Sequence, residues 1–338
     1  MSNTMRAVGY RKSLPIDDQE SLVDLELPVP APGPHDLLVR VEAVSVNPVD
    51  TKVRSGVDPD GELKVLGYDA AGVVEAVGDE VTLFAVGDEV YYAGNIARAG
   101  TNSEYHLVDE RITGHKPTSL DFTDAAALPL TTITAWETLF DRFKLGADST
   151  GTLLVTGAAG GVGSMVVQLA RALTGLTVIG TASRPESRQW VTELGAHHVV
   201  NHHGDLVKNT REVAPDGVDY IFSPFSAGKV EQFAQLIRVG GQVTAIDEPE
   251  GLDTLPLKER SGAWHWELMF SKPLFAPEDT SQHELLDQVA RLVDAGTLLG
   301  TATQRLRPIS ADTLRAAHRM VEESGMIGKV VLGGGFGS

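Results

Sequence analysis

A glycine-rich segment near the middle of the chain has the residue types and spacing of a phosphate-binding turn. Residues 153–163 read LLVTGAAGGVG and lie between a predicted strand and a predicted helix. Glycines have no Cβ, so this backbone can approach a pyrophosphate closely, and the following helix directs its free N–H groups at the phosphates. Ala158 replaces the usual first glycine, and a turn without a ligand is the alternative interpretation. The segment predicts a dinucleotide site formed by Ala159, Gly160, Gly161, Val162 and Gly163.

The end of the next predicted strand indicates which dinucleotide is bound. An acidic residue at this place, roughly 20 residues after the glycines, binds the ribose hydroxyls of NAD. Here the strand ends in Thr181-Ala182-Ser183-Arg184, with Arg188 shortly after. A hydroxyl and a guanidinium without a carboxylate suit the 2′-phosphate of NADP, so Ser183 and Arg184 are predicted to bind it. A solvated arginine at a helix start is the alternative for Arg184.

The elements that would position such a site fall into two parts of the chain, which differ in the spacing of their hydrophobic residues. Up to about residue 124, short β-type runs at 37–46, 70–77 and 88–92 are separated by Pro and Gly turns, which predicts a barrel or sandwich. A helical pattern then starts at residue 123 and runs through Leu139. Beyond it, strands alternate with helices, which predicts a parallel sheet. The predicted strands are 152–156, 176–180, 198–200, 218–222 and 242–246, and the predicted helices are 165–173, 185–194 and 230–237.

The composition is that of an ordinary globular protein with an acidic surface. A length of 338 residues favours two domains. Lys and Arg total 28 against 46 for Asp and Glu, a net charge of −18 that repels nucleic acid and anionic membranes. We find neither a membrane-spanning run nor a secretory signal, so we expect a cytoplasmic protein. The absence of cysteine excludes disulfides and thiolate metal ligands.

The two halves together resemble the medium-chain dehydrogenase/reductase superfamily, in its zinc-free, quinone oxidoreductase-like branch. Besides the glycine turn, the resemblance rests on the segments SVNPVDTKVRSG (45–56), GYDAAGVV (67–74), VGDEV (86–90), LPLTTITA (128–135) and GKVVL (328–332). Within that branch, the chain is most similar to bacterial proteins described as zinc-type alcohol dehydrogenase-like. The resemblance implies an α/β fold: a GroES-like β-barrel catalytic domain (1–128), a Rossmann doubly wound parallel-sheet NADP-binding domain (129–271), and a C-terminal return (272–338) completing the catalytic domain.

The resemblance also shows where this chain departs from zinc-dependent relatives. Those relatives carry Cys at the position of Asn47 and His at the position of Tyr68, and their structural zinc lobe needs four cysteines. Asn, Tyr and Asp69 without a thiolate make a poor site for zinc. We therefore expect no bound metal.

The resemblance places several residues near the nucleotide. It implies that Asn47 and Asp50 lie at the floor of the active-site cleft, that Thr134 binds the nicotinamide carboxamide, that Lys329 closes the cleft, and that His202 approaches the adenosine phosphate. Asn-Pro is a frequent turn, so a capping role is the alternative for Asp50.

The implied reaction is hydride transfer, for which the cofactor carries the chemistry. Without zinc, a quinone or an α,β-unsaturated carbonyl is the favoured substrate, because its developing charge is delocalised. Water, a ribose hydroxyl or Tyr92 are the candidate proton donors, and Tyr68 and Tyr92 join Asn47 and Asp50 as candidate catalytic residues. A carbonyl or alcohol dehydrogenase, and an NADPH-binding redox sensor without turnover, are the alternatives. Residues 264–270 resemble a strand that pairs two subunits, which implies a homodimer.

Overall fold

The computed structural model describes residues 4–323 and 325–336 and separates into two compact units. The first unit comprises residues 1–133 and 270–338, and the second comprises residues 134–269. These limits differ slightly from the boundaries after 128 and 271 that the sequence suggested. Two contacts within the first unit explain the difference. The Asp69 carboxylate accepts a hydrogen bond from the Leu130 backbone N–H, and the Phe270 ring packs edge-on against Tyr68, with centroids 5.3 Å apart.

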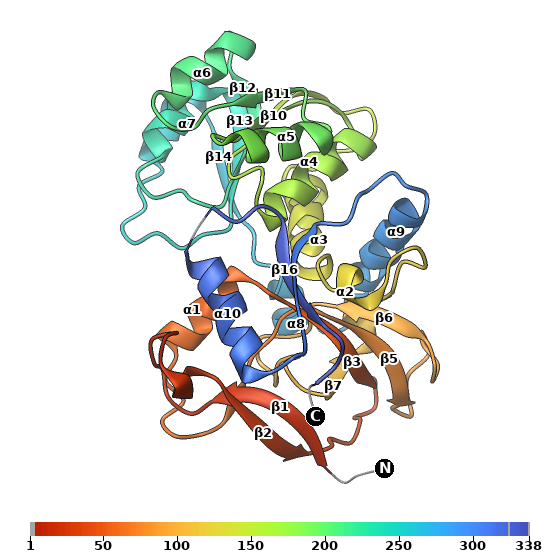
Figure 1. Cartoon of the computed structure of the whole chain (residues 1–338). Helices are drawn as coiled ribbons and strands as arrows, with labels where there is room; N and C mark the ends of the chain where they lie inside the picture. Colours follow the sequence, from red (N-terminus) through yellow and green to blue (C-terminus); the bar gives the residue numbers. More distant parts are fainter. Residues whose placement is uncertain (1–3, 324, 337–338) are drawn as a thin grey trace. The chain divides into compact units, whose positions relative to one another are not determined.

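The strands of the first unit form two sheets (Figure 1). The centre of the larger sheet is β3 (Asp36–Val46), which pairs with β5 (Ala70–Val77), β7 (Tyr105–Asp109) and β16 (Lys329–Gly333). The same sheet also contains β6 (Glu89–Tyr92), β8 (Thr113–His115) and β15 (Ala302–Leu306). The smaller sheet has the order β2-β1-β4, with β1 (Thr4–Tyr10), β2 (Val23–Pro28) and β4 (Lys64–Val65). Apolar side chains from both sheets share one core, as the short predicted strands require.

Helices cover this β-rich unit. The helix α10 (Ala311–Glu322) packs against α1 (Pro48–Gly56) and β16, and α9 (Ser281–Asp294) packs against β8. The close approach of α9 requires glycine at position 114, because a Cβ there would lie 2.4 Å from the Cβ of Leu286. The remaining elements are short: α2 (Phe122–Ala125), α8 (Ser271–Phe275), and the 3₁₀ helices η1 (Gln19–Ser21) and η2 (Glu110–Ile112).

The second unit is built on a six-stranded, fully parallel sheet with the order β11-β10-β9-β12-β13-β14. Its strands are β9 (Thr150–Val155), β10 (Gly175–Thr181), β11 (His198–Val200), β12 (Val218–Ser223), β13 (Ile237–Ala245) and β14 (Ala263–Trp266). The strand order reverses between β9 and β12, which is the arrangement of the doubly wound dinucleotide-binding fold. The predicted fold class is therefore confirmed.

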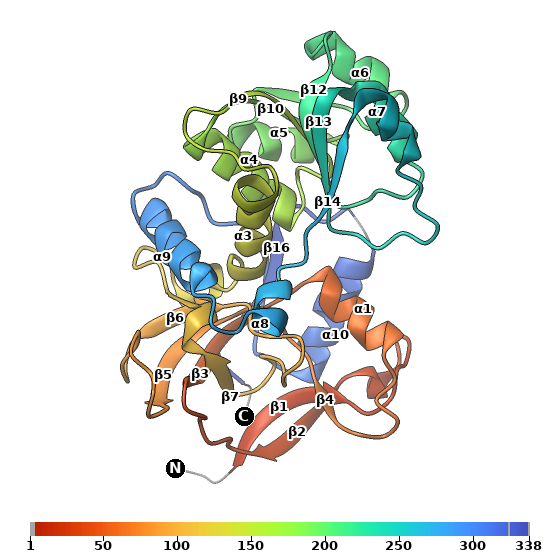
Figure 2. The same ribbon diagram turned by 180° about the vertical axis from the view of Figure 1, so that it is seen from behind.

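Helices lie on both faces of the parallel sheet (Figures 1 and 2). The helices α4 (Gly161–Leu173) and α5 (Pro185–Glu193) cover one face, and α6 (Leu206–Val213) and α7 (Val230–Leu236) cover the other. Alternate strand residues, such as Leu154, Ile221 and Val243, join the apolar side chains of α6 and α7 in one core. Continuous apolar strands are expected when both faces of a sheet are buried. The 3₁₀ helix η4 (Leu255–Arg260) precedes β14.

Two sequence predictions need correction. The helix predicted from residue 123 to 139 consists of α2, of α3 (Pro129–Trp136) and of a π-helical turn, η3 (Glu137–Arg142). Pro129 has no N–H to continue a preceding helix, so a new helix starts there. The predicted pairing strand at 264–270 is shorter and ends at Trp266; the Glu267 N–H still donates to the Ala245 carbonyl at 3.0 Å, and its buried carboxylate accepts a bond from Arg142 Nε at 2.8 Å.

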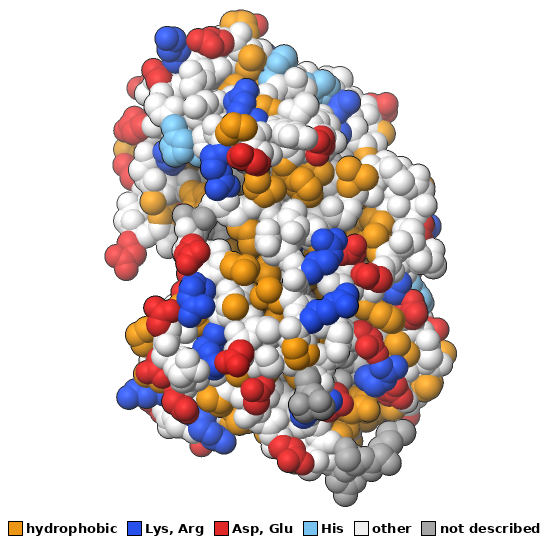
Figure 3. Space-filling model, in the orientation of Figure 1, with side chains coloured by type: hydrophobic (Ala, Val, Ile, Leu, Met, Phe, Trp, Pro, Cys, Tyr) orange, Lys and Arg blue, Asp and Glu red, His pale blue; other side chains and the backbone are white. Residues whose placement is uncertain are grey.

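Two surface properties bear on partners. Within the described residues, no helix combines the length and the apolar character that crossing a bilayer requires. Figure 3 shows acidic and basic side chains interspersed over one face of the molecule, so the acidic excess is not gathered into a single patch there.

Candidate functional site

In the first unit, strand pairing brings three polar residues together from distant parts of the sequence. Asn47 follows the end of β3, Asp69 precedes β5, and Lys329 begins β16. Both β5 and β16 pair antiparallel with β3, with Ala70 opposite Val44 and Val330 opposite Val46. The start of each partner strand therefore lies beside the end of β3, and the three side chains meet there.

The three side chains form a fully buried charge cluster. The Lys329 ammonium donates to Asn47 Oδ1, to Asp69 Oδ2 at 3.1 Å and to the Val46 carbonyl at 3.3 Å. Asp69 also accepts from Asn47 Nδ2 and from the Leu130 backbone N–H, each at 2.8 Å. Burial raises the pKa of Asp69 above its ordinary value, whereas Lys329, Asn47 and Leu130 all favour the carboxylate. Because every oxygen faces a donor, the geometry is that of an ion pair.

Asp50 lies close to Asn47 in the sequence, and its carboxylate accepts two backbone hydrogen bonds. One oxygen accepts from the Asn47 N–H at 2.8 Å at the start of α1, and the other accepts from the Gly67 N–H at 3.0 Å. Gly67 has a φ of +114°, which favours glycine. Burial raises the pKa of Asp50 to about 7, against the effect of these two bonds. The capping interpretation of Asp50 therefore describes its contacts.

The two candidate tyrosines are buried in the first unit. Burial, with smaller contributions from Asp50 and Tyr10, raises the pKa of the Tyr68 hydroxyl above its ordinary value. Tyr92 O is 3.1 Å from Nδ1 of His106, whose Nε2 is 2.9 Å from the Ala99 carbonyl. Burial lowers the pKa of His106 to about 4, so the ring is neutral, Nε2–H donates to the carbonyl, and Nδ1 accepts the Tyr92 proton. This contact holds the Tyr92 hydroxyl against His106 in the core of the first unit.

In the second unit, the glycine turn lies between β9 and α4, at the point where the strand order reverses. Gly157 has a φ of +61°, and its carbonyl accepts from the Gly160 N–H at 3.0 Å. A Cβ at position 163 would lie 2.3 Å from that carbonyl oxygen, so only glycine fits there, whereas a Cβ at Gly160 would meet nothing closer than 3.4 Å. A side chain would therefore fit at position 160, and the turn lies directly before α4, whose first N–H groups have no partner within the helix. The predicted turn fits a pyrophosphate.

The end of β10 lies beside this turn. The Thr181 hydroxyl accepts from the Gly157 N–H at 3.1 Å, a contact that sequence reasoning did not identify although Thr181 closes the second strand. Arg184 is exposed at the N-cap of α5, and its backbone N–H donates to Ser187 Oγ at 3.2 Å. Arg188 Nη1 is 3.4 Å from the Ala182 carbonyl. Two guanidinium-bearing side chains therefore lie at the end of this strand, next to half-buried Ser183.

Two further predicted residues lie elsewhere in the second unit. His202 is exposed in the loop after β11, at the same edge of the sheet, and its pKa is lowered by partial burial and by the charges of His203 and Lys229. Thr134 is buried in α3, at the first position of the unit. The structure therefore brings Ser183, Arg184 and His202 to the sheet edge that carries the glycine turn.

Comparisons with known proteins agree with this arrangement. A family model described as an alcohol dehydrogenase GroES-like domain matches residues 33–118, and one described as a zinc-binding dehydrogenase matches residues 161–264. A zinc-type alcohol dehydrogenase-like protein of Staphylococcus epidermidis is 38% identical over 335 residues, covering 97% of this chain and 99% of that protein. The chain belongs to the medium-chain dehydrogenase/reductase superfamily.

The chain is also similar to a curated protein and to a solved structure of the same superfamily. Human quinone oxidoreductase is 31% identical over 317 residues, covering 91% of this chain and 92% of that protein. The crystal structure of a putative zinc-dependent alcohol dehydrogenase protein from Rhizobium etli is 50% identical, with a TM-score of 0.95 and 99% of each chain covered. The superfamily is one of oxidoreductases, and the first unit contains its GroES-like domain.

Zinc in the names of the family model and of relatives raises the question of whether this chain can hold it. The side chains at the relevant positions are Asn47 and Tyr68, and the adjacent carboxylate of Asp69 is occupied by the Lys329 ammonium. The described residues contain no group of three His, Cys, Asp or Glu side chains placed to bind a metal ion. An amide oxygen and a phenol of raised pKa, beside an existing cation, do not fit zinc.

The buried ion pair gives a test of the cluster. We expect Lys329→Met to lower the free energy of unfolding by about 3–5 kcal/mol, because it leaves a buried carboxylate without its counter-charge. The double variant Asp69→Asn with Lys329→Met should recover at least about half of that loss. Denaturant unfolding of these two variants and of Asp69→Asn alone measures the coupling. Lys52→Met, on the exposed face of α1, is the control and should stay within about 0.5 kcal/mol of wild type. Additive losses in the double variant would contradict the assignment.

Proposed function

We propose that this superfamily member is an NADPH-dependent oxidoreductase that transfers a hydride to a quinone or an α,β-unsaturated carbonyl without a metal ion. The observation that carries the proposal is the Lys329 ammonium, held between Asn47 and Asp69 where zinc-dependent relatives need metal ligands. The quinone oxidoreductase among the relatives supports the same reaction class.

The second unit supports the cofactor part of the proposal. The N-terminus of α4 and the absence of a side chain at Gly160 suit a pyrophosphate, and the Thr181 hydroxyl holds the turn through the Gly157 N–H. Ser183 and Arg184 at the end of β10 suit a 2′-phosphate, and the strand end carries no carboxylate that would repel it. Bound NADPH supplies the hydride.

The first unit supports the substrate class. All three protons of the Lys329 ammonium face protein acceptors, so this cation has none left to donate to a substrate oxygen. The Tyr92 proton is engaged by His106. With no Lewis acid and neither of these donors available, an isolated ketone lacks stabilisation for its developing alkoxide. A conjugated acceptor spreads this charge over its own π-system. Solvent water and a ribose hydroxyl of the cofactor are the proton sources that this arrangement leaves.

A spectrophotometric assay tests the proposal. Protein purified without a metal-affinity tag should oxidise NADPH in the presence of quinones or enones, and a chelator should leave the rate unchanged. Simple aldehydes, ketones and alcohols should react at least about tenfold more slowly. Preference for an alcohol or simple carbonyl would instead identify a carbonyl or alcohol dehydrogenase. Tight NADPH binding without turnover of any acceptor would instead identify a redox sensor.

The cofactor preference rests on Arg184. A guanidinium can donate two charge-assisted hydrogen bonds to a 2′-phosphate, so Arg184→Ala should weaken NADPH binding by at least about tenfold. NADH has no phosphate at this position, so its dissociation constant should change by less than about threefold. Calorimetry with both nucleotides measures the difference. Equal weakening would make Arg184 structural, and a wild-type preference for NADH would refute the NADP assignment.

We also propose that two copies pair through β14. Among the described residues this strand pairs only with β13, so its outer edge keeps unused N–H and C=O groups. Trp266 and Leu268 beside that edge are 51% and 46% exposed.

Wild type should scatter light as a dimer at micromolar concentration, and Trp266→Glu should shift it towards monomer. Phe275→Glu, at an exposed site in the first unit, should not. A wild-type monomer would exclude the pairing.

A further inference from the structure

Two glutamates in the interior of the second unit belong to none of the sites described above. Glu137 begins the π-helical turn η3 and is fully buried, and Glu267 follows β14 with none of its side chain exposed. The chain enters this unit at Thr134 and leaves it after Met269, so the two glutamates lie on its entering and leaving segments. We propose that Glu137 and Glu267 form a carboxyl clasp, in which one shared proton holds these two segments together and the loss of that proton releases them. The proposal goes beyond the proposed function and does not depend on it.

The contact between the two side chains requires a proton. The Glu137 and Glu267 side chains are hydrogen-bonded to each other. Ionised carboxylates only accept hydrogen bonds, so a bond between two carboxyl groups exists only when one of them is protonated. Glu267 Oε1 is buried and has no N–H or hydroxyl donor among the described residues. A carboxyl proton is therefore the donor that completes this contact.

The charges around the clasp also favour one retained proton. Arg142 Nε donates to Glu267 Oε2 at 2.8 Å, and a single guanidinium balances only one carboxylate. A second negative charge in a dry interior would have neither water nor a counter-ion to stabilise it. Burial, followed by the charge and the hydrogen bond of Glu137, raises the pKa of Glu267 to about 9, against the opposing effect of Arg142. The clasp therefore keeps its proton at neutral pH.

The π-helical turn explains how η3 presents two side chains to Glu267. Arg142 lies five residues after Glu137, and an α-helix advances about 100° per residue, so residues five apart on an α-helix point to different sides. A π turn instead closes bonds between residues five apart, such as the bond from the Phe143 N–H to the Thr138 carbonyl at 3.1 Å. The acid and the base at the two ends of η3 thus reach the same partner.

The elements around the clasp carry few other charges. Helix α4 packs against η3 and has one charged residue, and the segment after η3 and strand β14 add the rest. The other charged or titratable side chains on these elements are Asp141, Lys144, Arg171 and His265. Burial and the charges of Arg142 and Lys144 lower the pKa of His265. Glu137 and Arg142 are the charged groups that act most strongly on Glu267, so the clasp titrates mainly through its own members.

The shared proton links the stability of the second unit to pH. A carboxyl group whose pKa is raised by folding holds a proton that the unfolded chain releases. Its stabilising contribution is complete below the unfolded pKa and is lost as the pH rises through the folded pKa. For Glu267 this window runs from the ordinary value of 4.5 to about 9. Within it, this one proton raises the equilibrium constant for unfolding by about tenfold per pH unit.

Glu267→Gln tests the proton, because an amide keeps a donor and an acceptor but does not titrate. The infrared absorption of protonated carboxyl groups at neutral pH should fall by one group in Glu267→Gln and also in Glu137→Gln. In denaturant unfolding between about pH 6 and about pH 8, the equilibrium constant of wild type should rise about tenfold more per pH unit than that of either variant. Equal pH dependence would make the pair a packing contact without a shared proton, whatever the change in stability, and would overturn the proposal.

Hydrogen–deuterium exchange tests whether the clasp opens. After correction for the intrinsic exchange rate, wild-type residues 137–143 and 264–269 should exchange at least about tenfold faster near pH 10 than near pH 7. The same segments of Glu267→Gln should keep one protection factor at both pH values. Wild-type segments that stay equally protected at both pH values would refute the release of the two segments.

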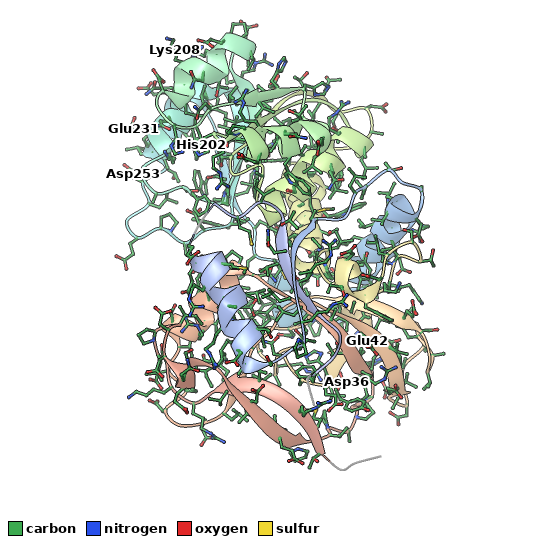
Figure 4. All side chains as sticks on the ribbon, in the orientation of Figure 1. Asp36, Glu42, His202, Lys208, Glu231 and Asp253 are labelled. Carbon is green, nitrogen blue, oxygen red and sulfur yellow. The ribbon has the colours of Figure 1, made fainter. Side chains whose placement is uncertain are left out.

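A matched control comes from an exposed glutamate of the same unit. Glu231 lies on α7, where Figure 4 shows its side chain, and it is exposed to solvent. Glu231→Gln should match wild type in infrared absorption, in the pH dependence of unfolding and in exchange. Far-UV circular dichroism checks that all three variants are folded, and Glu137→Gln still decides the question of the proton if Glu267→Gln does not fold.

Discussion

The buried carboxylate of Asp69 is the interaction on which the first unit depends. It receives hydrogen bonds from Asn47, Leu130 and Lys329, which belong to the start of α1, the start of α3 and the last strand. A buried charge is tolerated only when its partners are complete, so the chain must place all three donors at once. One carboxylate therefore links parts of the polypeptide that are separated by most of its length.

The polar residues of the two units are held in different ways. The first unit holds the side chains of Asn47, Asp69 and Lys329 in its interior, where both oxygens of the carboxylate and all three protons of the ammonium are already engaged. In the second unit, the candidate site is built from the glycine turn before α4 and from the exposed side chains of Arg184 and His202. This division agrees with the proposed function, in which the cofactor carries the chemistry and the second unit binds the nucleotide.

Local patterns predicted most of the secondary structure correctly. The strand at 70–77 and the strand at 198–200 have the predicted bounds, since apolar and β-branched residues there are bounded by turn residues. The long helix predicted from residue 123 was wrong, because periodicity does not register the missing N–H of Pro129. The predicted strand at 264–270 was too long, because β14 ends at Trp266 and the following α8 begins at Ser271.

The sequence by itself determined the glycine turn, the basic residues after the second strand of the parallel sheet and the absence of thiolate ligands, because these depend on residue types within short segments. Only the tertiary structure decided which side chains meet across long separations. The Lys329 ammonium donates to both Asn47 and Asp69, and the Asp50 carboxylate accepts from the Gly67 N–H. The Tyr92 hydroxyl contacts His106, and Phe225 lies beside the glycine turn. Such contacts depend on strand register and burial, which long-range packing fixes and local sequence does not encode.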